Sequence, residues 1–185
     1  MNHRKYQHLV REYRKSLKKF IVTSRFNNFT WKENQHYRSK NQKIGCIYCS
    51  PIRASSHIPM NEILFVLEMN NDTNEIMGIG MVRNQPVSKN HWVYSNGNYN
   101  RNVYTGKYRI DRQDMTPEEL ILIKAFDYLC FKGSKHMKRG DGLKAFPIEM
   151  IFNCYHNKMD LVEYINNMFK RRIAQESKSP ILNEK

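Results

Sequence analysis

Between residues 44 and 110 the sequence consists of short apolar runs, too brief for ordinary helices, that are separated by polar segments containing Asn, Asp, Gly or Pro. These runs are rich in Ile, Val and aromatic residues, which favour β-strands. Five of them stand out, at 44–49, 62–69, 75–82, 91–94 and 103–110. The polar stretch NNDTNE joins the second run to the third and predicts an antiparallel hairpin, in which Gly78 and Gly80 permit strong bending. The region therefore predicts a small twisted sheet that closes into a barrel.

Helical patterns flank this region on both sides. Residues 3–20 place apolar side chains three and four positions apart among Lys and Arg, which predicts a basic amphipathic helix. Residues 24–43 have no regular period and predict an irregular basic connection. Thr116-Pro-Glu-Glu supplies an N-cap, a first-turn proline and a capping-box glutamate, so a helix is expected from there to Gly133. Two more helices are expected, within 147–156 and 160–175.

These patterns together predict an α+β protein in which a small twisted β-barrel is accompanied by an N-terminal helix and about three C-terminal helices. A chain of 185 residues suffices for one good core, because a domain of this size buries roughly 70% of the surface that its unfolded chain exposes. The expected segments are a basic N-terminal part (1–43), a strand core (44–115), helices with a basic glycine-rich loop (116–176) and a flexible tail (177–185).

The charge balance points to a polyanionic partner. Lys and Arg number 31 against 17 Asp and Glu, which gives a formal net charge of +14, and such a surplus repels itself unless a polyanion neutralises it. RNA or single-stranded DNA is the expected partner. The alternative, an acidic membrane bound by the 3–20 helix, is not favoured, and no run approaches the roughly 18 apolar residues of a membrane-spanning helix. Without an apolar signal-peptide run, the protein is expected inside the cell or in a virion. Abundant Asn and scarce Ala are typical of an AT-rich coding genome, such as that of a large virus or a parasite.

The segment FKGSKHMKRGDGLKAFP, at 131–147, concentrates positive charge where the backbone is least constrained. Its three glycines allow backbone N–H groups to point at one anion, while the surrounding cations add full charges. The competing interpretation is a solvated loop between two helices. The order of residues is not that of a P-loop, so nucleotide hydrolysis is not indicated. The residues predicted to bind phosphate are Lys132, Lys135, His136, Lys138, Arg139, Gly140 and Lys144, together with Arg109 from the last strand-like run.

Three short motifs carry a family resemblance: I-Y-C-S at 47–50, the hairpin at 62–82 with its G-I-G, and Y-T-G-K-Y-R-I at 104–110. In order and residue type, residues 44–111 resemble the PUA-like superfamily of nucleic-acid-binding barrels, and within it the YTH and EVE domains. The resemblance implies a barrel that flips a base of RNA or DNA into an aromatic cage, as YTH domains do with N6-methyladenosine. It implies a cage of Tyr48, Trp92 and Tyr94 here, with Cys49 and Ser50 facing the edge of the base. The competing interpretation of these aromatic residues is a core position.

An enzyme is a less favoured alternative, because the sequence contains no nucleophile elbow, zinc-protease motif or paired-carboxylate motif. The resemblance to barrels of the ASCH type nevertheless keeps a hydrolase acting on nucleic acid open, and a basic virion or packaging protein is a third possibility. Cys46 and Cys49 have zinc-knuckle spacing, with Cys154 and His156 as further ligands, but a strand at 44–49 would place the two sulfurs on opposite faces. We therefore expect reduced thiols and neither a metal nor an organic cofactor.

Overall fold

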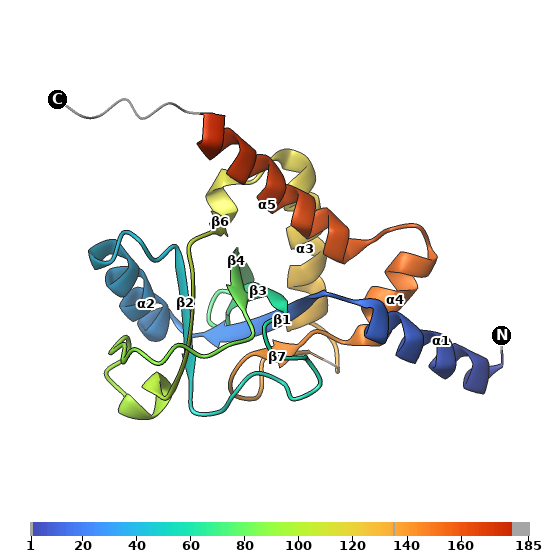
Figure 1. The fold of residues 1–185 in the computed structure, drawn as a ribbon, viewed down its shortest axis with the longest axis horizontal. Coiled ribbons are helices and arrows are strands. Elements are labelled where there is room, and N and C mark those ends of the chain that lie inside the picture. The colour runs from blue at the N-terminus through green and yellow to red at the C-terminus, as the bar shows by residue number, and fades with distance from the viewer. Residues whose placement is uncertain (1, 135, 179–185) are drawn as a thin grey trace. The chain divides into compact units, whose positions relative to one another are not determined.

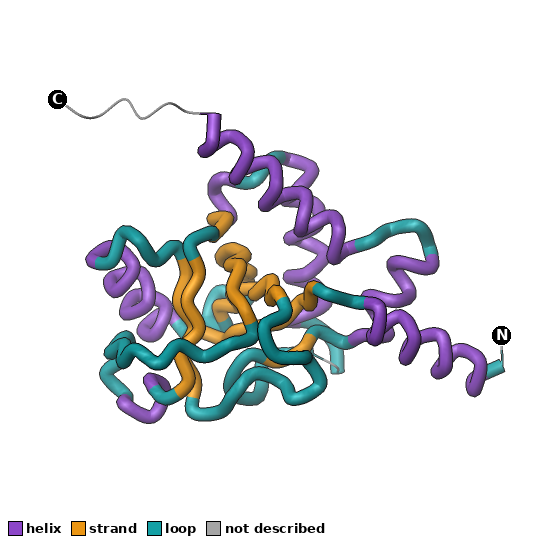
Figure 2. Tube along the Cα trace, in the orientation of Figure 1, coloured by secondary structure: helices purple, strands orange, loops and turns teal. Residues whose placement is uncertain are grey.

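A computed structural model of the chain describes residues 2–134 and 136–178 (Figure 1). It combines helices at both ends of the chain with a five-stranded sheet and a separate two-stranded sheet (Figure 2). The predicted α+β class is confirmed. The chain divides into two compact units: a larger one, Lys15–Phe146, and a smaller one that joins Met1–Arg14 to the segment from Pro147 onward.

The five-stranded sheet of the larger unit has the order β6-β4-β3-β1-β7. Its strands are β1 (Lys19–Phe26), β3 (Ile63–Asn70), β4 (Glu75–Arg83), β6 (Arg109–Asp111) and β7 (Lys144–Ala145). β3 and β4 form the predicted antiparallel hairpin, with Asn74 at a φ of 58° in the turn. β1 pairs with β3 in parallel, from Lys19 opposite Ile63 to Phe26 opposite Asn70. The parallel pairing brings the carboxyl ends of these two strands to the same edge of the sheet.

The two-stranded sheet consists of β2 (Cys46–Ser50) and β5 (Asn102–Gly106), which are antiparallel. The prediction of a closed barrel was wrong. Among the described residues, the edge strands β6 and β7 do not pair with each other, and β2 and β5 remain a separate sheet. The run at 103–110 was expected to be one strand but divides into β5 and β6, because its first half pairs with β2 and its second half with β4.

The prediction of an irregular connection at 24–43 was also wrong. Residues 24–26 end β1, and α2 (Asn28–Lys40) follows. Asn27 caps this helix: its Oδ1 accepts from the Thr30 backbone N–H at 2.8 Å, and the Asn27 N–H donates to Thr30 Oγ1 at 3.1 Å. This reciprocal cap uses Thr in place of the usual Glu or Gln. β1 was missed because its pairing depends on β3, more than forty positions later in the chain.

Residues 91–94 were expected to form a strand but lie in a loop. The backbone N–H groups of Val93 and Tyr94 both donate to Asn100 Oδ1 at 3.0 Å. Since a side chain takes these two donors, they are not offered to a neighbouring strand. The loop leads into the short 3₁₀ helix η1 (Gly97–Asn100).

The capping signal at Thr116 correctly predicted α3 (Pro117–Phe131), which follows the second short 3₁₀ helix, η2 (Arg112–Asp114). Thr116 Oγ1 accepts from the Glu119 N–H at 3.3 Å, and Glu119 Oε2 accepts from the Thr116 N–H at 3.1 Å. Lys132 ends the helix, and Gly133 follows with a φ of 77°. Positive φ is rarely adopted by other residues, which explains the stop.

The smaller unit contains α4 (Ile148–His156), α5 (Leu161–Lys178) and most of α1 (His3–Ser16). Phe152 packs against Tyr6 and Tyr13, with ring centroids 5.7 and 5.6 Å apart. The predicted amphipathic helix thus exists, but it ends at Ser16 because β1 begins at Lys19. Of the expected flexible tail, residues 177 and 178 belong to α5, and 179–185 lie outside the described residues.

No helix in the described part of the chain combines the length and apolar character needed to cross a bilayer.

Side chains of β1, β2, β3 and β5 form much of the core cluster of the larger unit, and Val82 of β4 joins it. Tyr48 is 1% exposed, and its hydroxyl donates to Glu68 Oε1 at 2.7 Å. A Cβ on Gly80 would overlap with the Tyr48 hydroxyl oxygen. The glycine therefore leaves room for the phenol to reach a buried carboxylate.

Candidate functional site

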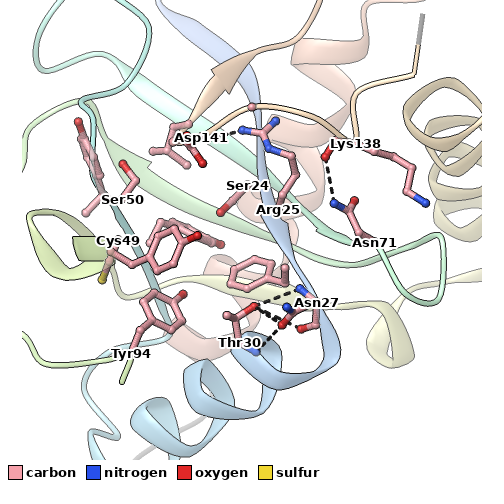
Figure 3. Close-up of a pocket in the computed structure, with 17 residues that line it drawn as sticks. Ser24, Arg25, Asn27, Thr30, Cys49, Ser50, Asn71, Tyr94, Lys138 and Asp141 are labelled. Carbon is pink, nitrogen blue, oxygen red and sulfur yellow. Dashed lines mark hydrogen bonds between the residues drawn. The ribbon is translucent and has the colours of Figure 1, made fainter. Parts of the chain in front are cut away.

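A cavity of about 210 Å³ opens in the larger unit (Figure 3). It lies near the carboxyl ends of the parallel strands β1 and β3, where ligand sites of sheets with parallel strands commonly form. β1 contributes Ser24, Arg25 and Phe26 to its lining, and the segment after β3 contributes Asn71. In Figure 3, Cys49, Ser50 and Tyr94 lie on one side, and Arg25, Asn71 and Lys138 on the other.

One wall of the cavity is aromatic. Tyr94, Tyr99 and Tyr104 contribute to it, and the rings of Tyr94 and Tyr99 meet edge to face with centroids 6.2 Å apart. Asn34 Nδ2 donates to the Tyr94 hydroxyl at 3.1 Å, and the Ala54 N–H donates to the Tyr104 hydroxyl at 2.9 Å. Burial raises the pKa of Tyr94 above its ordinary value, so its phenol stays neutral. These contacts hold two of the three rings in place before any ligand arrives.

The opposite wall is polar and cationic. Arg25 Nη2 donates to the Gly142 carbonyl at 2.6 Å, and Arg25 Nη1 donates to Thr23 Oγ1 at 3.1 Å. Burial lowers the pKa of Arg25, while the charge of Asp141 acts in the opposite direction. Asn71 Nδ2 donates to the Lys138 carbonyl at 3.0 Å. The guanidinium thus ties β1 to the glycine-rich loop, and Asn71 ties the β3–β4 turn to the same loop.

Two buried polar atoms of this wall are unsatisfied. Among the described residues, neither Arg25 Nε nor Asn71 Oδ1 has a hydrogen-bond partner. One of these atoms is a donor and the other an acceptor. Buried polar groups are nearly always paired, but neither atom is accessible from solvent, so a ligand in the open cavity does not reach them with the wall in this conformation.

The basic loop supplies part of the cavity lining. Lys138, Gly140, Asp141, Gly142 and Leu143 all line it. Gly140 and Gly142 have φ values of 103° and 73°, which bend the chain around the opening. Of the residues predicted to bind phosphate, the cavity therefore gathers Lys138 and Gly140.

The other described residues of this loop that were predicted to bind phosphate do not line the cavity. Arg139 and Lys144 are exposed, and Lys132 Nζ lies 5.8 Å from the Tyr128 ring centroid. His136 Nδ1 accepts from the Lys138 N–H at 3.4 Å. Lys135 lies outside the described residues.

Arg109, which was predicted to bind phosphate, lies in buried ion pairs and does not line the cavity. Its side chain is 7% exposed, and its Nη2 lies 2.7 Å from Glu68 Oε2, with Nη1 2.6 Å from Asp111 Oδ2. Burial alone lowers the pKa of Arg109, but Glu68 outweighs this effect and the net pKa is raised. The guanidinium is a structural ion-pair partner and not a surface cation.

The predicted cage of Tyr48 and Trp92 is not assembled. Tyr48 borders the cavity, but its hydroxyl is held in the core by Glu68. Trp92 is 72% exposed and does not line the cavity. Tyr94, Cys49 and Ser50, which were assigned to the same cage, do line it. Tyr94 and Tyr104 also line the cavity but are only 4% and 1% exposed, so the aromatic ring most open to a ligand is that of Tyr99, at 37%.

The thiols do not offer a reactive group in this cavity. The four cysteines carry free thiols. Burial raises the pKa of Cys49, which lines the cavity, to about 12, so this thiol stays protonated at neutral pH. Cys46 faces the Met81, Gly106 and Tyr108 carbonyls. Within residues 2–134 and 136–178, no group of three or more His, Cys, Asp or Glu side chains could hold a metal ion.

Sequence reasoning missed Arg25, Asn71, Tyr99 and Tyr104 as cavity residues. Arg25 lies in the segment that was predicted to be irregular. Asn71 lies in the polar stretch NNDTNE, whose composition predicts a hairpin turn but gives no sign of a binding site. For Tyr104 a signal existed, because it faces Tyr48 across the β2–β5 pair and belongs to the Y-T-G-K-Y-R-I motif.

No protein family model, curated protein or solved structure matches this chain.

Proposed function

We propose that this protein binds single-stranded nucleic acid and holds one unpaired base in the cavity between its tyrosine wall and its Arg25 wall. The observation that carries this proposal is the convergence of two segments some ninety positions apart in the sequence. The aromatic segment around Cys49 and Ser50 and the basic loop around Lys138 and Gly140 border the same small cavity.

The size and lining of the cavity suit a single flat polar ring. Its volume of about 210 Å³ is below the roughly 300–1,000 Å³ of pockets for drug-sized ligands. Aromatic side chains stack on any base, at about 1–3 kcal/mol per base. Arg25 and Asn71 contribute polar side chains to the opposite wall, and polar side chains are what recognise the edge of a base.

The phosphates that follow such a base would meet the basic loop. Lys138 lines the cavity, Arg139 directly follows it in sequence and is exposed, and Lys144, six positions later, is also exposed. Lys138 Nζ donates to a neutral partner, Asn74 Oδ1 at 2.8 Å, and this contact does not cancel its charge. The net charge of +14 adds a long-range attraction that does not depend on base identity.

The base-binding part of the proposal is tested with a Tyr99→Ala variant and an unstructured oligonucleotide of mixed sequence. Tyr99 lines the cavity and is already 37% exposed, so its removal should cost little stability. We expect it to weaken binding by about 1–3 kcal/mol. Tyr155→Ala is the matched control, because this tyrosine is 49% exposed and lies outside the cavity. Equal affinities of the two variants would contradict a base in the cavity.

The phosphate part is tested by salt titration of the Lys138→Ala/Arg139→Ala variant. On a single strand, the slope of log affinity against log salt should fall by about 1.4, or about 0.7 for each phosphate that is no longer neutralised. Lys40→Ala/Lys43→Ala removes the same charge, and Lys40 lies roughly 15 Å along α2 from the cavity residue Thr30. This control should keep the slope within error.

Two other outcomes would replace the proposal. A protein that binds duplex and single strand alike, without any effect of Tyr99→Ala, would be a non-specific packaging protein. Cleavage of labelled RNA or DNA, with or without a divalent metal, would indicate a hydrolase.

A further inference from the structure

Trp92 is the most exposed large hydrophobic side chain of the described residues, at 72%. The outer end of its indole rests against η1: a Cβ built on Gly97 would lie 3.0 Å from Trp92 Cη2 and 3.6 Å from Cζ2. A side chain at position 97 would therefore push the indole away. Gly97 lets the ring lie close to the backbone while most of its surface stays open to solvent.

The backbone on both sides of Trp92 is fixed. His91 is buried, and its Nδ1 lies 2.6 Å from the Tyr37 hydroxyl, which connects it to α2. On the other side, the Val93 and Tyr94 N–H groups share Asn100 Oδ1, and Asn100 Nδ2 donates to the Tyr94 carbonyl at 2.7 Å. The exposure of Trp92 is thus built into an anchored loop and does not result from a frayed segment.

The same loop also forms part of the cavity wall. Trp92 precedes Tyr94 by two positions, and Gly97 precedes Tyr99 by two positions, and both tyrosines line the cavity. The anchored loop therefore presents two aromatic surfaces: tyrosine rings on the cavity side and one indole in solvent. Such a pair of surfaces suits two neighbouring units of one strand.

The surroundings of Trp92 favour a base over a protein partner. Its sequence neighbours Asn90, Ser95, Asn96 and Asn98 are polar and exposed. Protein interfaces usually have an apolar centre formed by several residues, whereas a base needs only one aromatic ring and polar groups around it. We propose that Trp92 stacks on the base next to the one held in the cavity, so that the protein grips two successive bases; this inference rests on the proposed function.

The test uses three decamers with the same backbone: one with all bases, one in which every second position is abasic, and one fully abasic. In the alternating decamer, any base that enters the cavity has no neighbouring base, whatever the binding register. We expect Trp92→Ala to weaken binding of the complete decamer roughly 5- to 150-fold, which is the range for stacking one base. Binding of the alternating decamer should stay unchanged, and Trp92→Phe should keep part of the affinity for the complete decamer.

Tryptophan fluorescence gives a second readout. The chain has two Trp residues, and Trp31 is only 6% exposed. The complete decamer should therefore quench the emission of Trp92 more strongly than the alternating one, and Trp92→Ala should remove this difference. Identical effects of Trp92→Ala on both decamers, or no effect on either, would overturn the inference.

The two proposals fail in different ways. If the wild-type protein binds the alternating decamer no better than the fully abasic one, no base enters the cavity and the proposed function fails. If it discriminates these two but Trp92→Ala matches the wild type on the complete decamer, the cavity stands and only the role of Trp92 is wrong.

Discussion

At the scale of single residues, a buried carboxylate organises the core behind the cavity. Glu68 is 1% exposed. It accepts from the Tyr48 hydroxyl at 2.7 Å and from Arg109 through Nε and Nη2. The Arg109 and Arg38 guanidinium carbons each lie 5.5 Å from the Trp31 ring centroid. Tyr48, the residue that the sequence made a cage candidate, is thus fixed by this network.

This network predicts the effect of Arg109→Met. The variant leaves Glu68 buried without its charged partner, and breaking a buried pair in this way costs about 3–5 kcal/mol of unfolding free energy. Urea unfolding followed by circular dichroism measures the loss. Arg101→Met, at an exposed position, is the control and should change stability by less than about 0.5 kcal/mol. If Arg109→Met were instead as stable as wild type but had a flatter salt slope, Arg109 would be a phosphate ligand after all.

At the scale of elements, the glycine-rich loop matters through its shape as well as its charge. The Gly142 carbonyl accepts a hydrogen bond from Arg25. A Cβ built on Gly142 would lie 3.0 Å from Ile52 Cγ1 and 3.3 Å from Ser50 Oγ. Gly133 has a similar φ of 77°, yet a Cβ there would meet nothing within 4 Å. Both positions therefore favour glycine because their φ is positive. Only at position 142 do neighbouring side chains also leave little room for a Cβ.

The comparison of Gly142→Ala with Gly133→Ala separates these two requirements. Each variant should lose about 1–2 kcal/mol of stability, because an L-residue is strained at these φ values. Only Gly142→Ala should also weaken oligonucleotide binding, since its methyl group pushes on Ser50 and Ile52 next to the cavity. Calorimetric titration of both variants with one oligonucleotide measures the difference. A matching loss of affinity in Gly133→Ala would show that general loosening of the loop, and not the wall at Gly142, affects binding.

At the scale of the whole molecule, the net charge of +14 should act with opposite signs on stability and on the proposed binding of nucleic acid. Like charges repel within the compact state, so screening by salt should favour folding. The same screening removes the gain from releasing counterions of the nucleic acid, so binding should weaken. The cavity itself draws its lining only from residues 24–143, inside the larger unit.

Raising NaCl from about 0.02 to about 0.2 M should therefore raise the free energy of unfolding and lower the affinity for a single-stranded oligonucleotide. Urea melts and binding titrations in the same buffers give the two slopes. Lys40→Ala/Lys43→Ala, which carries two positive charges fewer, should gain less stability from salt than the wild type. A fall in stability with salt would mean that net attraction between charged groups, and not repulsion, dominates the folded state.

The sequence by itself determined the features that depend on near neighbours. The Thr116 capping box, the stop at Gly133 and the β3–β4 hairpin each depend on residues within a few positions or on one turn, so their patterns are visible locally. The excess of cations is a property of composition, and the basic glycine-rich loop is visible as a run of letters.

Only the tertiary structure decided which of these residues meet. The parallel pairing of β1 with β3 places Arg25 and Asn71 at the cavity. Arg109 and Tyr48, which the sequence assigned to phosphate binding and to the aromatic cage, are both held in the core by Glu68. Trp92 and Tyr94 carry the same aromatic signal in the sequence, yet one is exposed and the other lines the cavity. The physical reason is that strand pairing and burial depend on contacts between distant segments, which the local order of residues does not specify.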